Sequence, residues 1–96
     1  MLILVGTLPF KDLKLYAGTV GIEDGSLLVG NRRFPINRGT AAMIASCSVV
    51  LKRYGLPEPY CVISGDTGRG TGSVHIYKFL CENIAVLGAN VVAFHY

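Results

Sequence analysis

The sequence has little charge. Only 16% of its 96 residues are Asp, Glu, Lys or Arg, while 51% are hydrophobic, and an average soluble domain is about 25% charged. A chain of this length forms one domain around one core. With so few charged residues, some apolar side chains would remain exposed on the surface of a single chain. We therefore expect residues 1–96 to fold as a single domain and to assemble as a homo-oligomer.

The sequence also lacks a basic stripe. Nine basic and six acidic residues give a formal net charge of +3, and the basic residues are scattered without a long run. Proteins that bind nucleic acids usually carry a denser basic cluster with interleaved aromatic residues. The charge pattern argues against nucleic acid as a partner. It suits an anionic small molecule, which needs only one or two well-placed arginines.

Cysteine is sparse and follows no motif. Cys47, Cys61 and Cys81 all lie in apolar stretches, none belongs to a CxxC pair, and the odd number argues against a disulfide framework. No group of His and Cys residues has the spacing of a zinc site, so no metal site is predicted. We expect three buried, reduced thiols in a cytoplasmic protein.

The apolar opening of the chain is short. Residues 1–5 are too few for the core of a signal peptide, and far fewer than the roughly 20 apolar residues of a membrane-spanning helix. The sequence therefore predicts no membrane partner.

Apolar periodicity and turn residues divide the chain into strands and helices. Strands are expected at residues 2–5, 26–29, 60–63 and 91–94, and Gly30-Asn31 predicts a β-hairpin between 26–29 and 32–36. Helices are expected at residues 41–54 and 73–87. The strand–helix–strand order of residues 60–95 makes its two strands parallel. The pattern predicts a small α/β sandwich with four or five strands, partly parallel, and two principal helices.

Two weaker local patterns complete this prediction. Residues 11–17 suggest one short helical turn. Between residues 41 and 51 only Ser46 and Ser48 are polar, so the first helix should be packed on most sides. Asn37 or Thr40 is expected to cap its start.

The most distinctive stretch is the glycine-rich connection that follows the strand at residues 60–63. Glycines permit a close approach of backbone N–H groups, and the helix that follows supplies unpaired donors and partial positive charge. A strand, a glycine-rich loop and a helix start therefore predict a site for a phosphate or carboxylate group. Its expected ligand-binding residues are Gly65, Thr67, Gly68, Arg69, Gly70, Thr71, Gly72 and Ser73.

This loop does not complete either of two known phosphate-binding motifs. Gly65 and Gly70 have the spacing of a P-loop, but Thr71-Gly72 stands where that motif needs Lys followed by Ser or Thr. Gly68-x-Gly70 is compatible with a dinucleotide fingerprint, but residues 88–96 contain no acidic residue to hold the ribose. The sequence therefore names no cofactor.

A second helix start has a similar composition. Arg38, Gly39 and Thr40 precede the first long helix and follow a strand, as the glycine loop does. Ligands of open α/β sheets tend to bind beyond the carboxyl ends of parallel strands. We therefore expect Arg38 and Arg69 to converge on one anion, with Gly39 and Thr40 among the binding residues. Asp66, the only carboxylate in this set, is the candidate catalytic residue.

The sequence leaves three functions open. The chain is an enzyme or nucleotide-responsive subunit that uses a phosphate-bearing ligand, a binding or regulatory subunit without chemistry, or an oligomerising module in which the loop is only a turn. In the last case Asp66 forms an Asx-turn. We place ligand binding above catalysis, because one carboxylate in a small chain does not easily position two substrates.

Overall fold

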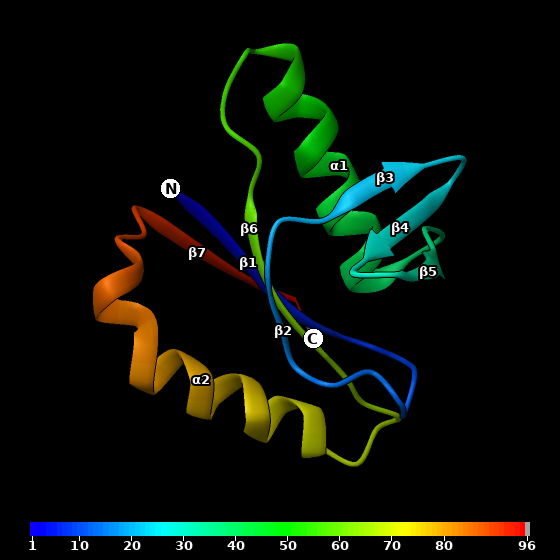
Figure 1. The fold of residues 1–96 in the computed structure, drawn as a ribbon, viewed down its shortest axis with the longest axis vertical. Helices are drawn as coiled ribbons and strands as arrows, with labels where there is room; N and C mark the ends of the chain where they lie inside the picture. Colours follow the sequence, from blue (N-terminus) through cyan, green and yellow to red (C-terminus); the bar gives the residue numbers. More distant parts are fainter. Residues whose placement is uncertain (96) are drawn as a thin grey trace.

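The chain forms two sheets and two helices. The computed structural model describes residues 1–95 (Figure 1). In chain order the elements are β1 (Leu2–Leu8), β2 (Tyr16–Gly18), β3 (Gly21–Glu23), β4 (Ser26–Val29), β5 (Arg32–Pro35), α1 (Gly39–Arg53), β6 (Tyr60–Gly65), α2 (Thr71–Leu87) and β7 (Val91–His95). The predicted small α/β domain is confirmed, with its partly parallel sheet, hairpin and two principal helices. It has seven strands in the described residues because two three-residue strands add to the five expected.

The larger sheet has the strand order β2-β6-β1-β7. β1 is parallel to both β6 and β7, so the two strands of the strand–helix–strand unit are parallel as predicted, with β1 between them. β2 is an antiparallel edge strand. The register pairs Leu8 with Gly65 and Gly6 with His95, so the carboxyl ends of three parallel strands meet at one edge.

Alternating side chains of this sheet build two separate cores. On one face Leu4 and Leu8 pack with Ile44 of α1 and with buried residues of the β3-β4-β5 sheet. On the other face Ile3 and Val5 pack with α2. Figure 1 shows the same arrangement, with α2 on one side of the sheet and α1 with the hairpin sheet on the other. Successive side chains of β1 point to opposite faces of the sheet, and both faces are buried. This explains why β1 is an almost continuous apolar run.

The expected helical turn at residues 11–17 is wrong. Residues 11–12 form a turn and β2 begins at Tyr16, which pairs with Ile63 of β6. A three-residue strand has too little sequence to show a period, and its pairing with a distant strand decides its conformation.

The first helix is less covered than its composition predicts. Thr40, Ala41 and Ile44 are its buried residues, whereas the side chains of Val49 and Val50 are 63% and 54% exposed. The expectation that α1 is packed on most sides is therefore wrong for a single chain. Among the described residues, no helix combines the length and the apolarity needed to cross a membrane.

The three thiols differ in burial. Cys61 is fully buried in β6, and burial raises the pKa of its thiol to about 12. Cys47 is half-buried and Cys81, on α2, is exposed. The prediction of buried thiols is thus confirmed for Cys61 and wrong for Cys81.

Candidate functional site

The glycine-rich loop folds around the carboxylate of Asp66. Backbone N–H groups on the loop and on the first turn of α2 point toward this side chain, and five of them donate hydrogen bonds to it. Oδ1 accepts at 2.9, 2.9 and 3.1 Å, and Oδ2 at 3.1 and 3.4 Å, from Gly68, Arg69, Gly70, Gly72 and Ser73 in that order. The predicted cradle of donors is present, and a side chain of the chain itself lies in it.

Glycine is required where the loop is tightest. A Cβ on Gly72 would lie 2.4 Å from the carbonyl oxygen of Gly65, which is closer than any Cβ contact allows. Gly70, the residue before α2, has a φ of 83°, in the left-handed region that favours glycine. These two positions bring the start of α2 against the end of β6, within reach of Asp66.

Asp66 has little capacity left for a ligand. An ionised carboxylate has about four lone-pair sites, and five N–H groups already donate to this one. Partial desolvation raises the pKa of Asp66, but the backbone hydrogen bonds, led by those from Gly70 and Gly68, outweigh it and leave the pKa below its ordinary value. The side chain is therefore an ionised cap of α2, in agreement with the turn interpretation of the loop.

The start of α1 is built differently. Arg38 is the N-cap residue, in an extended conformation, and its own side chain does not cap the helix; the first turn has no acidic residue, and no other side chain among residues 1–95 accepts a hydrogen bond from its N–H groups. The expectation that Asn37 or Thr40 would cap α1 is therefore wrong. The Oγ1 atom of Thr40 instead lies 3.4 Å from Nδ1 of His95, at the end of β7. Within the part of the chain that the structure describes, the first N–H groups of α1 thus have no side-chain acceptor.

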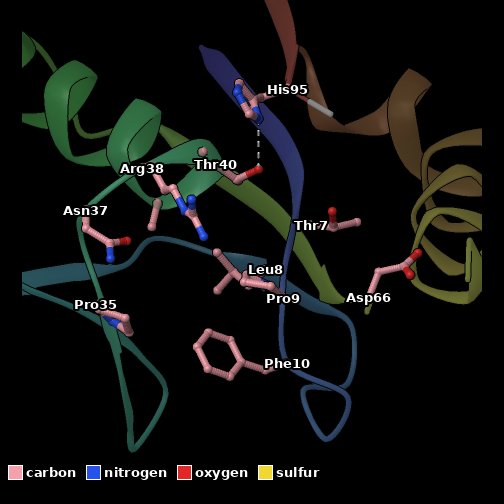
Figure 2. Close-up of a pocket in the computed structure, with 12 residues that line it drawn as sticks. Thr7, Leu8, Pro9, Phe10, Pro35, Asn37, Arg38, Thr40, Asp66 and His95 are labelled. Carbon is pink, nitrogen blue, oxygen red and sulfur yellow. Dashed lines mark hydrogen bonds between the residues drawn. The ribbon is translucent and has the colours of Figure 1, made fainter. Parts of the chain in front are cut away.

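A cavity of about 480 Å³ opens at this helix start (Figure 2). Arg38 and Asp66 lie on opposite sides of it, Thr40 and His95 on a third side, and Leu8 and Phe10 opposite them. The cavity lies at the edge where the parallel strands end, as the sequence predicts for a ligand site. Its lining residues are Thr7, Leu8, Pro9, Phe10, Pro35, Asn37, Arg38, Gly39, Thr40, Ala41, Asp66 and His95.

Gly6 of β1 permits a close approach between α1 and β7 beside the cavity. A Cβ at this position would lie 2.4 Å from Oγ1 of Thr40 and 2.8 Å from the carbonyl oxygen of His95. The missing side chain lets the first turn of α1 approach the sheet. Thr40 is consequently only 4% exposed, and its hydroxyl is fixed against the His95 ring.

Comparison with known proteins adds nothing to this geometry. No protein family matches the chain, and neither a curated protein nor a solved structure is significantly similar to it. The function must therefore be argued from the site itself.

The predicted site residues fall into three groups: those at the first cavity, those at a second cavity, and those at neither. Arg38, Gly39 and Thr40 line the cavity together with Asp66. Gly65 and Thr71 line a second cavity, of about 570 Å³, whose other lining residues are Lys11, Asp12, Leu13, Lys14, Leu15, Ser64 and His75.

The remaining loop residues lie outside these cavities. Thr67 and Arg69 are exposed, and neither lines either cavity. The two arginines expected to converge thus do not share a cavity. No three His, Cys, Asp or Glu side chains among residues 1–95 lie close enough to hold a metal ion.

Eight of the twelve residues that line the first cavity were not among the predicted site residues, and three of these eight are the most informative. Thr7 and His95 lie near the carboxyl ends of β1 and β7, and Phe10 follows β1. A signal for Thr7 and His95 exists, since a polar residue at the end of an apolar strand lies at the ligand-binding edge of a parallel sheet. For Phe10 no sequence signal exists, because its place depends on its ring contact with Phe34, 5.0 Å away between centroids.

Proposed function

We propose that this chain binds a small anionic molecule in the cavity at the start of α1. Phosphate-bearing molecules, including nucleotides, are the favoured class. The observation that carries the proposal is the gathering of Arg38, Thr40 and His95 with an uncapped helix N-terminus around one cavity.

Electrostatics favour an anion at this place. The N-terminus of a 15-residue helix carries partial positive charge and N–H donors without a side-chain acceptor. Arg38 stands at that end, and no carboxylate among residues 1–95 forms an ion pair with it. A guanidinium without an internal partner can give a phosphate or carboxylate two parallel hydrogen bonds.

The opposite side of the cavity favours a ligand with an apolar part. Leu8, Pro9 and Phe10 line it, and an aromatic ring offers a flat surface for stacking. An anion attached to an apolar or planar group fits this division better than a free inorganic ion does. This places phosphate monoesters and nucleotides ahead of sulfate and phosphate.

Binding is favoured over catalysis. Asp66, the only carboxylate among the described residues that line the cavity, already accepts five hydrogen bonds and has a lowered pKa, so it is poorly suited to accept a proton from a substrate. The Thr40 hydroxyl is almost completely buried. We therefore propose a binding or regulatory subunit, working as a homo-oligomer in the cytoplasm, a compartment that suits the three free cysteines.

A second candidate function is an oligomerising module without a ligand. Large apolar side chains exposed on both α1 and α2 favour it, among them Val50 at 54% and Val74 at 64%. One chain could have both functions. A measurement of anion binding distinguishes them, because only the first function requires a ligand.

A thermal-shift screen tests the proposal. The panel holds phosphate, sulfate, phenyl phosphate, sugar phosphates and nucleotides, each with and without magnesium. A ligand at 100 times its Kd stabilises the folded chain by about 2.7 kcal/mol. We expect phenyl phosphate or a nucleotide to raise Tm more than inorganic phosphate does.

Two variants locate the effect. Arg38→Ala should reduce the shift to about half or less, whereas Arg53→Ala, at an exposed arginine at the other end of the same helix, should keep it. The proposal is overturned if no anion raises Tm, or if both variants respond as the unmodified chain does.

A further inference from the structure

The strand β7 lies at the edge of the larger sheet without the features that protect edges. In the part of the chain that the structure describes, β7 pairs only with β1. Its five residues, Val-Val-Ala-Phe-His, include no proline and no Lys, Asp or Glu. Natural proteins usually blunt an exposed edge with a charge, a proline or a bulge, because an open edge pairs with other strands. An edge of this kind is suited to adding a strand.

The surface beside this edge is apolar. A groove of about 320 Å³ runs between α2 and β7, lined by Tyr77, Leu80, Cys81, Ile84, Val92 and Phe94. The rings of Tyr77 and Phe94 stack at 6.2 Å between centroids, and each residue is 49% exposed. Val91, at the start of β7, is 57% exposed. The groove and the strand edge thus form one continuous apolar surface.

The chain exposes more surface than its mass requires. Its accessible area is 5984 Å², whereas a compact monomer of 10.3 kDa exposes about 5,350 Å². The difference is roughly 600 Å², and a stable interface covers about 800 Å² on each partner. An excess of this size is what a dimer of standard interface area would largely remove.

We propose that a second copy of this chain binds at β7 and α2. The two β7 strands pair antiparallel across a two-fold axis, which joins the larger sheets of the two copies, and the two α2 helices pack over the junction. This interface is independent of the proposed anion site, because it requires no ligand.

Charge supports a second copy as the occupant. A two-fold axis places like residues near one another, so a charged edge would repel itself. β7 carries no Lys, Arg, Asp or Glu, and the charged residues of α2 are Lys78 and Glu82, of opposite sign. Antiparallel copies of α2 therefore bring no net repulsion.

The other exposed surfaces are less suited to this role. The opposite edge of the sheet, β2, is only three residues long. The apolar residues Val49 and Val50 lie on α1, and the strand edge beside Val49 is β3, which is only three residues long. Among the described edge strands, only β7 combines five residues without Lys, Arg, Asp, Glu or Pro with a neighbouring apolar groove.

Sedimentation of matched variants tests the interface. The unmodified chain should form a dimer at micromolar concentration. Val91→Lys puts a charge on the strand edge at an exposed position, and Val50→Lys puts the same charge on α1 at nearly equal exposure. We expect Val91→Lys to raise the dissociation constant about a hundredfold or more, because each substitution occurs twice across a two-fold, and Val50→Lys to leave it unchanged.

Thiol labelling of the unmodified chain gives a second measurement, which needs no folded variant. Cys81 is exposed in a single chain and lines the groove, so its labelling should slow at least about tenfold as the chain is concentrated through the dissociation constant. The proposal is overturned by a chain that stays at 10.3 kDa, by a dimer lost in Val50→Lys but kept in Val91→Lys, or by a Cys81 labelling rate that does not change with concentration.

Discussion

The two long helices begin at the same edge of the sheet and satisfy their first N–H groups in opposite ways. At α2, the Asp66 carboxylate accepts hydrogen bonds from Gly72 and Ser73 and from the loop before them. At α1, no side chain of residues 1–95 caps the first turn, and Arg38 lines a cavity. One helix start is closed by an internal anion, and the other is open to an external one.

The difference shows that glycine content alone does not identify an anion site. Both starts have the donors and the partial positive charge that attract an anion. What separates them is whether a carboxylate accepts hydrogen bonds from the first N–H groups, and among residues 1–95 this happens only at α2. A glycine-rich loop before a helix can therefore be a self-contained cap as readily as a ligand cradle.

Removing the internal anion should affect the folded chain most. Asp66→Asn places amide hydrogens against N–H groups that now donate to Oδ2, and the closed helix start loses its charge. We expect a clear loss of Tm at neutral pH. The control is Asp12→Asn, an exposed carboxyl in the loop after β1, which should leave Tm nearly unchanged.

The pH dependence of stability also tests the role of the Asp66 carboxylate, because it predicts the direction in which stability changes with pH. Hydrogen bonding lowers the pKa of Asp66 in the folded chain. Its stabilising contribution is therefore complete above the unfolded-state pKa of about 3.9, and is lost as the pH falls through the lower folded value. Acid denaturation of Asp66→Asn should lack this contribution. An unchanged acid profile would show that the carboxylate does not hold the loop.

The closed start should also be the less tolerant of side chains. Gly72→Ala forces a Cβ to within 2.4 Å of a backbone oxygen, and overpacking of this kind costs about 1–3 kcal/mol. Gly39→Ala at the open start meets nothing nearer than 3.9 Å and bears mainly the cost of its positive φ, about 1 kcal/mol. Denaturant unfolding measures both. Equal losses would remove the distinction between the two starts.

The anion affinities of two arginine variants compare the two helix starts directly. Arg38→Ala should weaken binding of the best anion from the screen by about 1.5–3 kcal/mol, the cost of a charge-assisted hydrogen bond. Arg69→Ala, on the closed loop and outside the cavity, should change it little. Isothermal titration decides. A loss at Arg69 with none at Arg38 would move the site to the glycine loop.

The smallest effect is expected at Thr40. Thr40→Val removes the hydroxyl that contacts His95 while keeping the shape of the side chain. Loss of one neutral hydrogen bond should weaken anion binding by about 0.5–1.5 kcal/mol. Titration of the variant at pH 7 measures this, and Ser46→Ala, at an exposed position of the same helix, serves as the control. Equal affinities for the two variants would exclude the hydroxyl from the site.

Much of the fold followed from local sequence signals. The long apolar runs, the Gly30-Asn31 turn and the period of α2 predicted five of the strands and both helices. The three-residue strands β2 and β3 were missed, because pairing with distant segments decides their conformation. The insertion of β1 between β6 and β7 also has no local signal.

The sequence predicted where the candidate site lies, but not the contacts within it. The edge of the sheet and the residues Arg38 to Thr40 followed from the strand ends and the helix start. The sequence left open whether Asp66 would turn back onto its own loop or serve a ligand, since that choice depends on the close approach of Gly72 to Gly65. Nor did it show that Gly6 would let Thr40 reach His95, 55 residues away.

The most direct test of the central difference is a nuclear magnetic resonance titration of the amide groups at both helix starts. The chain is titrated with phenyl phosphate, and amide chemical shifts are followed at residues 38–41 and 68–73. We predict concentration-dependent shifts at residues 38–41, where the donors have no side-chain acceptor, and none of comparable size at residues 68–73, where Asp66 holds the donors. Shifts confined to residues 68–73 would contradict this account.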